Sequence, residues 1–138
     1  MKTACELMST LALPSIRARI AKVAIEKYGM RQKDVALRLG LTRAAVSQYM
    51  KEKRAGPTIS ETHLKSIEDM IDNASMGLAK GELSEFDLTR AFCRMCAALR
   101  HSQALCAIHK AREPKLVGKN CLICGDMNHR QSDFEIVL

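Results

Sequence analysis

The stretch from Gln32 to Arg54 constrains the fold most, because it predicts two short helices joined by a tight turn. Gly40 is expected to end the first helix, since glycine accepts the left-handed backbone that a sharp turn needs. Thr42 is a good N-cap for the second helix, which is expected to run roughly from residue 43 to residue 51. Apolar residues at helical spacing are expected to face inward: Val35, Ala36, Leu39, Leu41, Val46 and Met50. Ala36 is small, which suits a close crossing of the two helices.

Four side chains of the second helix are expected on its outer face: Arg43, Ala44, Ser47 and Gln48. These types suit the major groove of DNA. Arginine donates to two acceptors of guanine, glutamine pairs with the edge of adenine, alanine contacts the methyl group of thymine, and serine is permissive. Three basic residues follow where phosphates would pass: Lys51, Lys53 and Arg54. Residues 31–54 carry seven Lys or Arg against two Asp or Glu, which is most of the net charge of +7, as expected of a phosphate binder. The alternative is an ordinary helical hairpin with a solvated basic face.

The same stretch resembles the helix-turn-helix of the phage-repressor-like regulators, the XRE type. That family has a Gln, a Leu/Val–Ala pair, a Leu–Gly pair and a Ser/Thr-capped recognition helix, and this chain has there Gln32, Val35–Ala36, Leu39–Gly40 and Thr42. The resemblance implies that Gln32 holds a phosphate and that the outer residues Arg43, Ala44 and Gln48 face base edges. Ser47 departs from the acidic residue that some members carry, so its role stays open. The opening residues CELMSTLALPSIRARIAKVAIEKYG, the AAVSQYM helix and the later cysteines also resemble a group of small archaeal XRE-like regulators.

Length and composition favour a small all-α protein. A chain of 138 residues is expected to form one compact domain, or one domain and a small appendage. Three prolines and little β-branched alternation favour helices, and the absence of tryptophan makes the core aliphatic. We expect a four- to five-helix helix-turn-helix domain over residues 1–56, a connecting or dimerisation helix over residues 57–81, and a small cysteine-rich helical metal-binding region with a C-terminal tail over residues 82–138. No stretch approaches the roughly 20 apolar residues of a membrane span, and we expect a cytoplasmic protein.

Two helices are expected to flank the hairpin. The first begins at Pro14, ends at Gly29 and supports the back of the hairpin. The second, about residues 60–79, has a narrow apolar stripe: Leu64, Ile67, Ile71, Ala74 and Leu78. Gly77 and Gly81 are expected to loosen its end. The stripe suits either the core of the protomer or the seam of a homodimer that binds a palindromic operator, and the sequence leaves both open.

A further helix is expected to start with Ser84 as its cap and to run to about Arg100, because an acidic residue follows the serine three positions on. Its apolar contacts are expected from Phe86, Leu88, Phe92, Met95 and Leu99. A polar turn over residues 101–103 and a short helical turn over residues 105–110 come next. The final FEIVL is apolar, and the sequence does not decide between an edge strand, a partner-binding tail and disorder.

Six cysteines point to metal binding or redox chemistry, because disulfides are rare in the cytoplasm. Three pairs have the spacing of metal ligands: Cys93 and Cys96, Cys106 and His109, and Cys121 and Cys124. Spacing leaves three closures open: zinc on Cys93, Cys96, Cys121 and Cys124, zinc on Cys93, Cys96, Cys106 and His109, or a cluster on Cys5, Cys93, Cys96 and Cys106. The archaeal resemblance implies the third closure, with an iron–sulfur cluster of the 4Fe–4S type. Each cysteine can also be a small buried apolar residue.

Together these features predict a dimeric, sequence-specific regulator of double-stranded DNA whose cysteine-ligated centre senses redox state or iron–sulfur supply. A cluster that forms or is lost can change the geometry of a dimer, and so the spacing of its half-sites. The alternatives are a regulator with a purely structural zinc, a dithiol redox protein, and an antitoxin or adaptor whose C-terminal FEIVL docks a partner. No βαβ pattern surrounds either C-x2-C pair, and there is no phosphate loop, nucleophile elbow or credible carboxylate pair. We therefore do not expect an enzyme.

Overall fold

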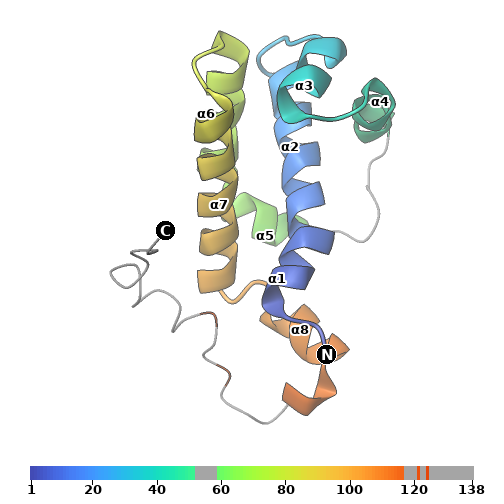
Figure 1. The fold of residues 1–138 in the computed structure, drawn as a ribbon, viewed down its shortest axis with the longest axis vertical. Coiled ribbons are helices and arrows are strands. Elements are labelled where there is room, and N and C mark those ends of the chain that lie inside the picture. Colours follow the sequence, from blue (N-terminus) through green and yellow to red (C-terminus); the bar gives the residue numbers. More distant parts are fainter. Residues whose placement is uncertain (52–58, 117–120, 122–123, 125–138) are drawn as a thin grey trace, which may run out of the picture.

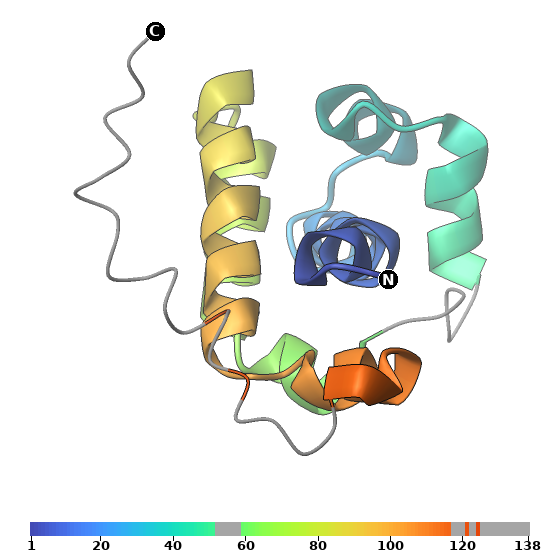
Figure 2. The same ribbon diagram turned by 60° about the horizontal axis from the view of Figure 1, so that its bottom comes forward.

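The computed structural model describes residues 1–51, 59–116, 121 and 124, and throughout these residues the regular structure is helical (Figure 1). The all-α prediction is confirmed. The elements follow in chain order: α1 (Ala4–Leu7), the π-helical turn η1 (Met8–Ala12), α2 (Leu13–Glu26), α3 (Gln32–Leu39), α4 (Arg43–Lys51), α5 (Glu61–Lys65), α6 (Glu68–Lys80), α7 (Glu85–His101), α8 (Cys106–Arg112) and the 3-10 turn η2 (Pro114–Leu116). The central helix is α2, with α6 and α7 on one side of it and α4 on the other (Figure 1, Figure 2).

The elements α1, η1 and α2 form one continuous rod that begins at Ala4, so the start expected at Pro14 is wrong. Thr3 and Glu6 begin the helix early with a capping box, in which the Thr3 hydroxyl accepts from the Glu6 amide at 3.3 Å and the Glu6 carboxylate accepts from the Thr3 amide. Proline inside an α-helix clashes with a carbonyl of the preceding turn. The wider π-helical turn η1 lies just before Pro14, and it lets the rod continue past the ring.

The single helix expected over residues 60–79 is in fact two helices, α5 and α6, with a break at Ser66 and Ile67. The Ser66 hydroxyl donates to the His63 carbonyl at 2.6 Å, and this bond competes with the helical ladder. Ile67 leaves the helical conformation with φ −117° and ψ 16°, and its side chain is buried. The apolar period continues on both sides of the break, so the period alone does not reveal it.

The apolar stripe of this segment belongs to the core of the protomer. All of its residues are buried: Leu64, Ile67, Ile71, Ala74 and Leu78. They pack towards α2, and ion pairs border the contact: Arg19 lies 3.1 Å from Glu61 and 3.2 Å from Glu68, and Lys27 lies 2.7 Å from Asp72. The hydrogen bond from Lys27 holds the pKa of the Asp72 carboxyl below its usual value. A dimer seam therefore has to use other residues.

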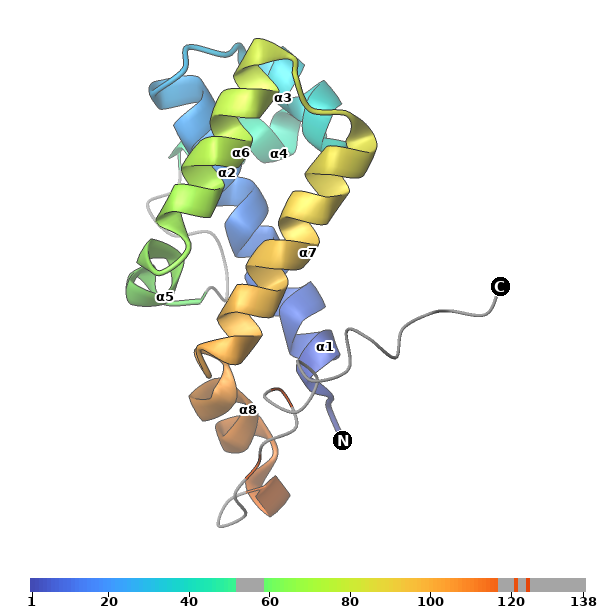
Figure 3. The same ribbon diagram turned by 90° about the vertical axis from the view of Figure 1, so that its left-hand side faces the viewer.

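Helix α7 begins as the sequence predicts, with a capping box between Ser84 and Asp87, and it packs on α6 and α2 (Figure 3). Its inner face buries Leu88, Met95 and Leu99. The expectation that Phe86 joins this face is wrong, because its side chain is 73% exposed, with the guanidinium of Arg90 5.6 Å from the ring centroid. Phe86 lies two positions before Leu88, about 200° around the helix, and so points the other way.

The glycines at the end of α6 shape the turn into α7 and do not loosen it. Gly81 adopts φ +70° and ends the helix, and the amide of Glu82 donates to the carbonyl of Gly77 at 3.0 Å. Gly77 is buried within α6, where an added Cβ would lie 2.8 Å from Cγ of Leu83. Because Gly77 has no side chain, the Leu83 side chain can pack against α6 at this position.

One hydrophobic cluster joins all three segments expected from the sequence, since it runs from Leu7 to Leu105. Along the long axis of the molecule, α3 and α4 lie towards one end, whereas α1, α8 and the N-terminus lie at the other (Figure 1, Figure 3). The rod of α1, η1 and α2 connects the two ends. It carries Cys5 near its start and supports the α3–α4 hairpin near its finish.

Candidate nucleic-acid interface

The turn between α3 and α4 has the geometry that the sequence predicts. Gly40 adopts the left-handed conformation with φ 63° and ψ 34°, which glycine tolerates without a Cβ clash. The amide of Leu41 then donates to the carbonyl of Ala36 at 2.8 Å, and the Thr42 hydroxyl accepts from the amide of Ala45 at 3.0 Å. These bonds satisfy groups that the two helix ends leave open, so the angle between α3 and α4 is set locally.

Helix α4 is anchored through one buried side chain, Val46, which is 0% exposed. Leu41 and Tyr49 are partly buried and pack against the same core. Met50, expected on the inner face, is half-buried. The inner face is therefore turned slightly towards Tyr49, which lies three positions after Val46 and was not among the residues expected to face inward.

The outer face of α4 is open to solvent. Arg43, Ala44 and Gln48 are exposed and Ser47 is half-buried, while Lys51 and Gln32 are also exposed. Figure 1 and Figure 2 both place α4 across α2 from α6 and α7, so these described helices do not cover it. Lys53 and Arg54, expected near phosphates, lie outside the described residues. The described candidates, apart from the half-buried Ser47, are thus open to solvent.

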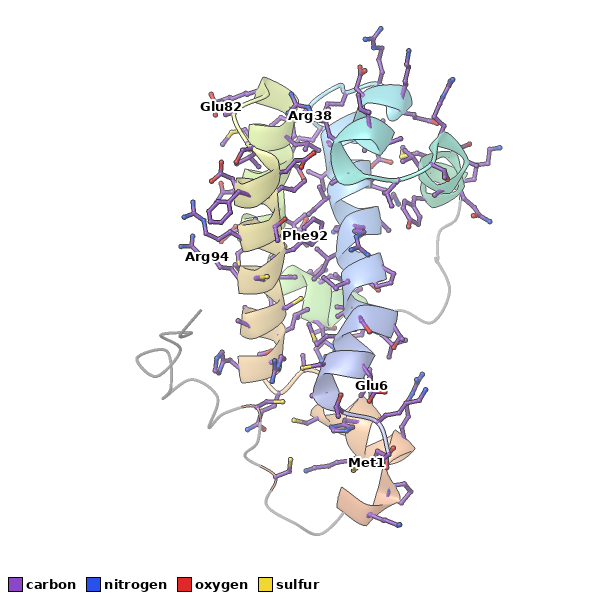
Figure 4. The ribbon with its side chains drawn as sticks, in the orientation of Figure 1. Met1, Glu6, Arg38, Glu82, Phe92 and Arg94 are labelled. Atoms are coloured by element: carbon purple, nitrogen blue, oxygen red, sulfur yellow. The ribbon has the colours of Figure 1, made fainter. Side chains whose placement is uncertain are left out.

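Other basic residues near the hairpin contact the protein itself. Arg31 pairs with Asp34 at 2.8 Å, and Figure 4 shows Arg38 between α3 and the end of α6. Nη2 of Arg38 lies 3.0 Å from the position that a Cβ on Gly81 would take. A cation there complements the negative end of the α6 dipole. Arg38 therefore contributes to the fold, a role that the charge count alone assigned to phosphate binding.

Three of the expected metal ligands lie within electrostatic reach of one another near the rod's start. Burial raises the pKa of the Cys96 thiol first, and the neighbouring charges of Cys93 and, less strongly, Cys5 raise it further. Arg100 donates to Sγ of Cys5 at 3.8 Å. Cys5 and Cys93 are exposed and Cys96 is half-buried, so all three thiols are accessible from this end of α7.

Cys106, the fourth expected ligand, lies on α8 and has different neighbours. Burial raises the pKa of its thiol, and the nearby charges of Cys124 and Cys121 raise it further. All six cysteines are free thiols. Within residues 1–51, 59–116, 121 and 124, no three Cys, His, Asp or Glu side chains are already arranged to hold a metal ion. Cys106 lines one cavity with His109, Cys121 and Cys124.

The helices of the described part of the chain include none that is both long and apolar enough to cross a membrane. Residues 22–69 match the family model HTH_3, whose description is helix-turn-helix. No curated protein and no solved structure matches the chain. The family match covers the last five residues of α2, the α3–α4 hairpin and α5, together with the start of α6. Residues 22–69 are thus similar to a helix-turn-helix, and this likeness supports a DNA-binding transcription regulator.

Proposed function

We propose that this protein is a sequence-specific regulator that reads double-stranded DNA with the outer face of α4. The observation that carries the proposal is the exposure of Arg43, Ala44 and Gln48 on a helix whose opposite face is fixed by Val46. The major groove of B-DNA admits one α-helix, and these side chains match its hydrogen-bonding edges and methyl groups. A rigidly anchored helix presents them at fixed spacing, so the contacts distinguish one base sequence from another.

Phosphate contacts are proposed for the residues that border α4. Gln32 begins α3 and Lys51 ends α4, and both side chains are exposed. Contacts to phosphates fix the register of a protein on the duplex without reading its sequence. Lys53 and Arg54 continue the basic run in the sequence. Binding to any duplex is therefore expected to weaken as salt rises, because bound cations are released from DNA by the protein's positive charges.

Lys51→Ala tests these phosphate contacts. Loss of one phosphate contact is expected to make the slope of log affinity against log salt shallower by about 1, equally for all sequences. Arg94→Ala is the matched control, because this change also removes one positive charge. Arg94 lies on the far side of α7 and points away from α2 (Figure 4). Titration of full-length proteins with a random duplex at several salt concentrations measures both slopes. Equal slopes for the Lys51 variant and the wild type would contradict the contact.

The regulator is proposed to act as a homodimer on a palindromic operator, because one helix-turn-helix contacts few base pairs. The stripe on α5 and α6 is buried inside the protomer, so the pairing surface lies elsewhere. Half-site spacing fixes the distance between the two copies of α4. Anything that moves α4 relative to the pairing surface therefore changes affinity.

An iron–sulfur cluster on Cys5, Cys93 and Cys96 is proposed as the sensing centre, with a structural zinc as the alternative. The three thiols fit a soft metal centre in chemistry and accessibility. Cys106, the fourth ligand expected from the sequence, lines a cavity with Cys121 and Cys124, and we leave it out of this proposed set. Iron–sulfur chemistry would supply sensitivity to oxidants and to iron supply. Cys5 belongs to the rod that supports α3 and α4, so fastening or releasing the rod's start at α7 would shift the hairpin.

Purification of the full-length protein without oxygen tests this centre. We expect a brown protein with iron and sulfide, and a colourless preparation from Cys93→Ser, because that change removes one thiolate of the set. Cys121→Ser is the matched control and is expected to keep its iron. A colourless wild type whose zinc is lost from Cys93→Ser and kept by Cys121→Ser would favour a structural zinc at this set. Equal iron in the wild type and the Cys93 variant would remove Cys93 from the ligands.

A further inference from the structure

A second group of metal-binding side chains lies around a cavity of about 490 Å³ between the N-terminus and α8. Among the residues that line the cavity are three cysteines and a histidine that can bind a metal: Cys106, His109, Cys121 and Cys124. Cys106 and His109 are three positions apart on α8, so they share one face of that helix. Both are half-buried, as are Cys121 and Cys124. The sequence contains the same four residues as two pairs, each with a spacing that metal sites use.

His109 has the hydrogen bond that metal-binding histidines usually make. Its Nε2 lies 2.7 Å from the backbone carbonyl oxygen of Lys2. A carbonyl oxygen only accepts hydrogen bonds, so Nε2 must carry the proton. In a neutral ring Nδ1 then holds the free lone pair. A histidine that ligates a metal through one nitrogen almost always donates the other N–H to a carbonyl or carboxylate, which fixes the orientation of the ring.

The other polar groups of the cavity are less suited to the role. The carboxylate of Glu113 already accepts from the backbone amide of Lys2 and lies 3.9 Å from the N-terminal ammonium group of Met1. His101 also lines the cavity, but it is the last residue of α7 and is exposed. The remaining donors that line the cavity are three thiols and the His109 imidazole, whose tautomer leaves Nδ1 available.

We propose that Cys106, His109, Cys121 and Cys124 form a zinc site that is separate from the Cys5, Cys93 and Cys96 set. Three thiolates and one imidazole are a common ligand set of structural zinc, which prefers four such ligands at the corners of a tetrahedron. The four groups line the cavity without yet meeting at one point, and the ion draws them together.

The site would fasten the C-terminal region to the start of the chain. His109 contacts the backbone of Lys2, and Cys121 and Cys124 follow the end of α8 in the sequence. Zinc has no redox chemistry of its own, so this site would stabilise the end of the molecule where the proposed sensing thiols lie. Its existence does not depend on DNA binding or on iron.

Zinc analysis of the full-length protein, supplied with zinc alone under reducing conditions, tests the proposal. The wild type is expected to bind about one zinc per chain with these four ligands, and His109→Ala and Cys121→Ser are expected to retain almost none. His101→Ala is the matched control for the histidine, and Cys93→Ser for the cysteine; both are expected to keep the zinc. Loss of zinc from either control, or its retention in both ligand variants, would overturn the assignment.

Two measurements on the wild type keep the test informative where a variant fails to fold. Cobalt in place of zinc is expected to give the absorption bands of a tetrahedral site with thiolate ligands. Nitrogen NMR of the His109 ring is expected to show a protonated Nε2 and a metal-bound Nδ1. A wild type that binds no zinc, or a His109 ring unchanged by metal, would overturn the proposal. Iron and sulfide are measured separately, so failure of the zinc site leaves the cluster proposal intact.

Discussion

Ile71→Ala is expected to lower the free energy of unfolding by about 2–5 kcal/mol, as is usual when a buried aliphatic side chain is truncated in a core. Ile71 is fully buried in α6, on the side that packs along α2. One turn further on, the Ser75 hydroxyl donates to the Ile71 carbonyl at 2.8 Å and lies 3.4 Å from the carbonyl of Ile20 in α2. The backbones approach closely there, so the structure has little freedom to collapse into the cavity.

Urea denaturation of the full-length protein at two protein concentrations measures this loss. Asn73→Ala is the matched control, because Asn73 is exposed on the same helix and changes at such sites are usually within about 0.5 kcal/mol. If Ile71 belongs to the core of the protomer, the loss of free energy of unfolding relative to the wild type is the same at both protein concentrations. A loss that depends on concentration would instead assign Ile71 to a dimer seam, and a loss below about 1 kcal/mol would contradict tight packing there.

The double variant Arg43→Ala/Gln48→Ala is expected to lose about 2–6 kcal/mol of affinity for its selected duplex, since each base-reading contact contributes about 1–3 kcal/mol. Both side chains are exposed and one and a half turns apart on α4, so their contributions should be close to additive. Affinity for a random duplex should fall much less, because phosphate contacts supply that binding. Titration with both duplexes separates the two effects. Equal losses on the two duplexes would show that the pair contributes charge without reading bases.

The α3–α4 hairpin could be predicted residue by residue because local chemistry determines it. Gly40 supplies the left-handed turn and Thr42 supplies the cap, and both act within a few positions of themselves. The start of α7 at Ser84 was predictable for the same reason. Capping groups are short-range signals, so a sequence reading finds them without knowing the tertiary structure.

Features that leave no mark on the apolar period, or that depend on packing, were not predicted. The break at Ser66 leaves the apolar period intact, and the roles of Gly77 and Arg38 depend on Leu83 and Gly81, which only the fold brings near. The early helix start at Ala4 was a different kind of miss, because Thr3 and Glu6 give a capping signal that the sequence contains. The prediction placed the start of the helix at Pro14 instead, because proline is common at the first position of a helix.

Cysteine spacing predicted pairs of ligands but not how the pairs combine. Cys106 is near Cys96 in sequence, yet it lines one cavity with Cys121 and Cys124. The contact between His109 and the carbonyl of Lys2 joins α8 to the start of the chain. No local sequence pattern predicts this contact. The grouping of the thiols therefore follows from the fold of α7 and α8 against the N-terminus.

The central claim is that α4 reads base sequence, and selection of binding sites from a randomised duplex pool tests it most directly. Full-length wild type and Gln48→Ala are used in parallel, and Arg94→Ala serves as the control. The wild type and the control are expected to enrich one shared motif, while the Gln48 variant enriches the same motif with the preference relaxed at one base-pair position per half-site. An identical motif from all three proteins, or no enriched motif from the wild type, would contradict the claim.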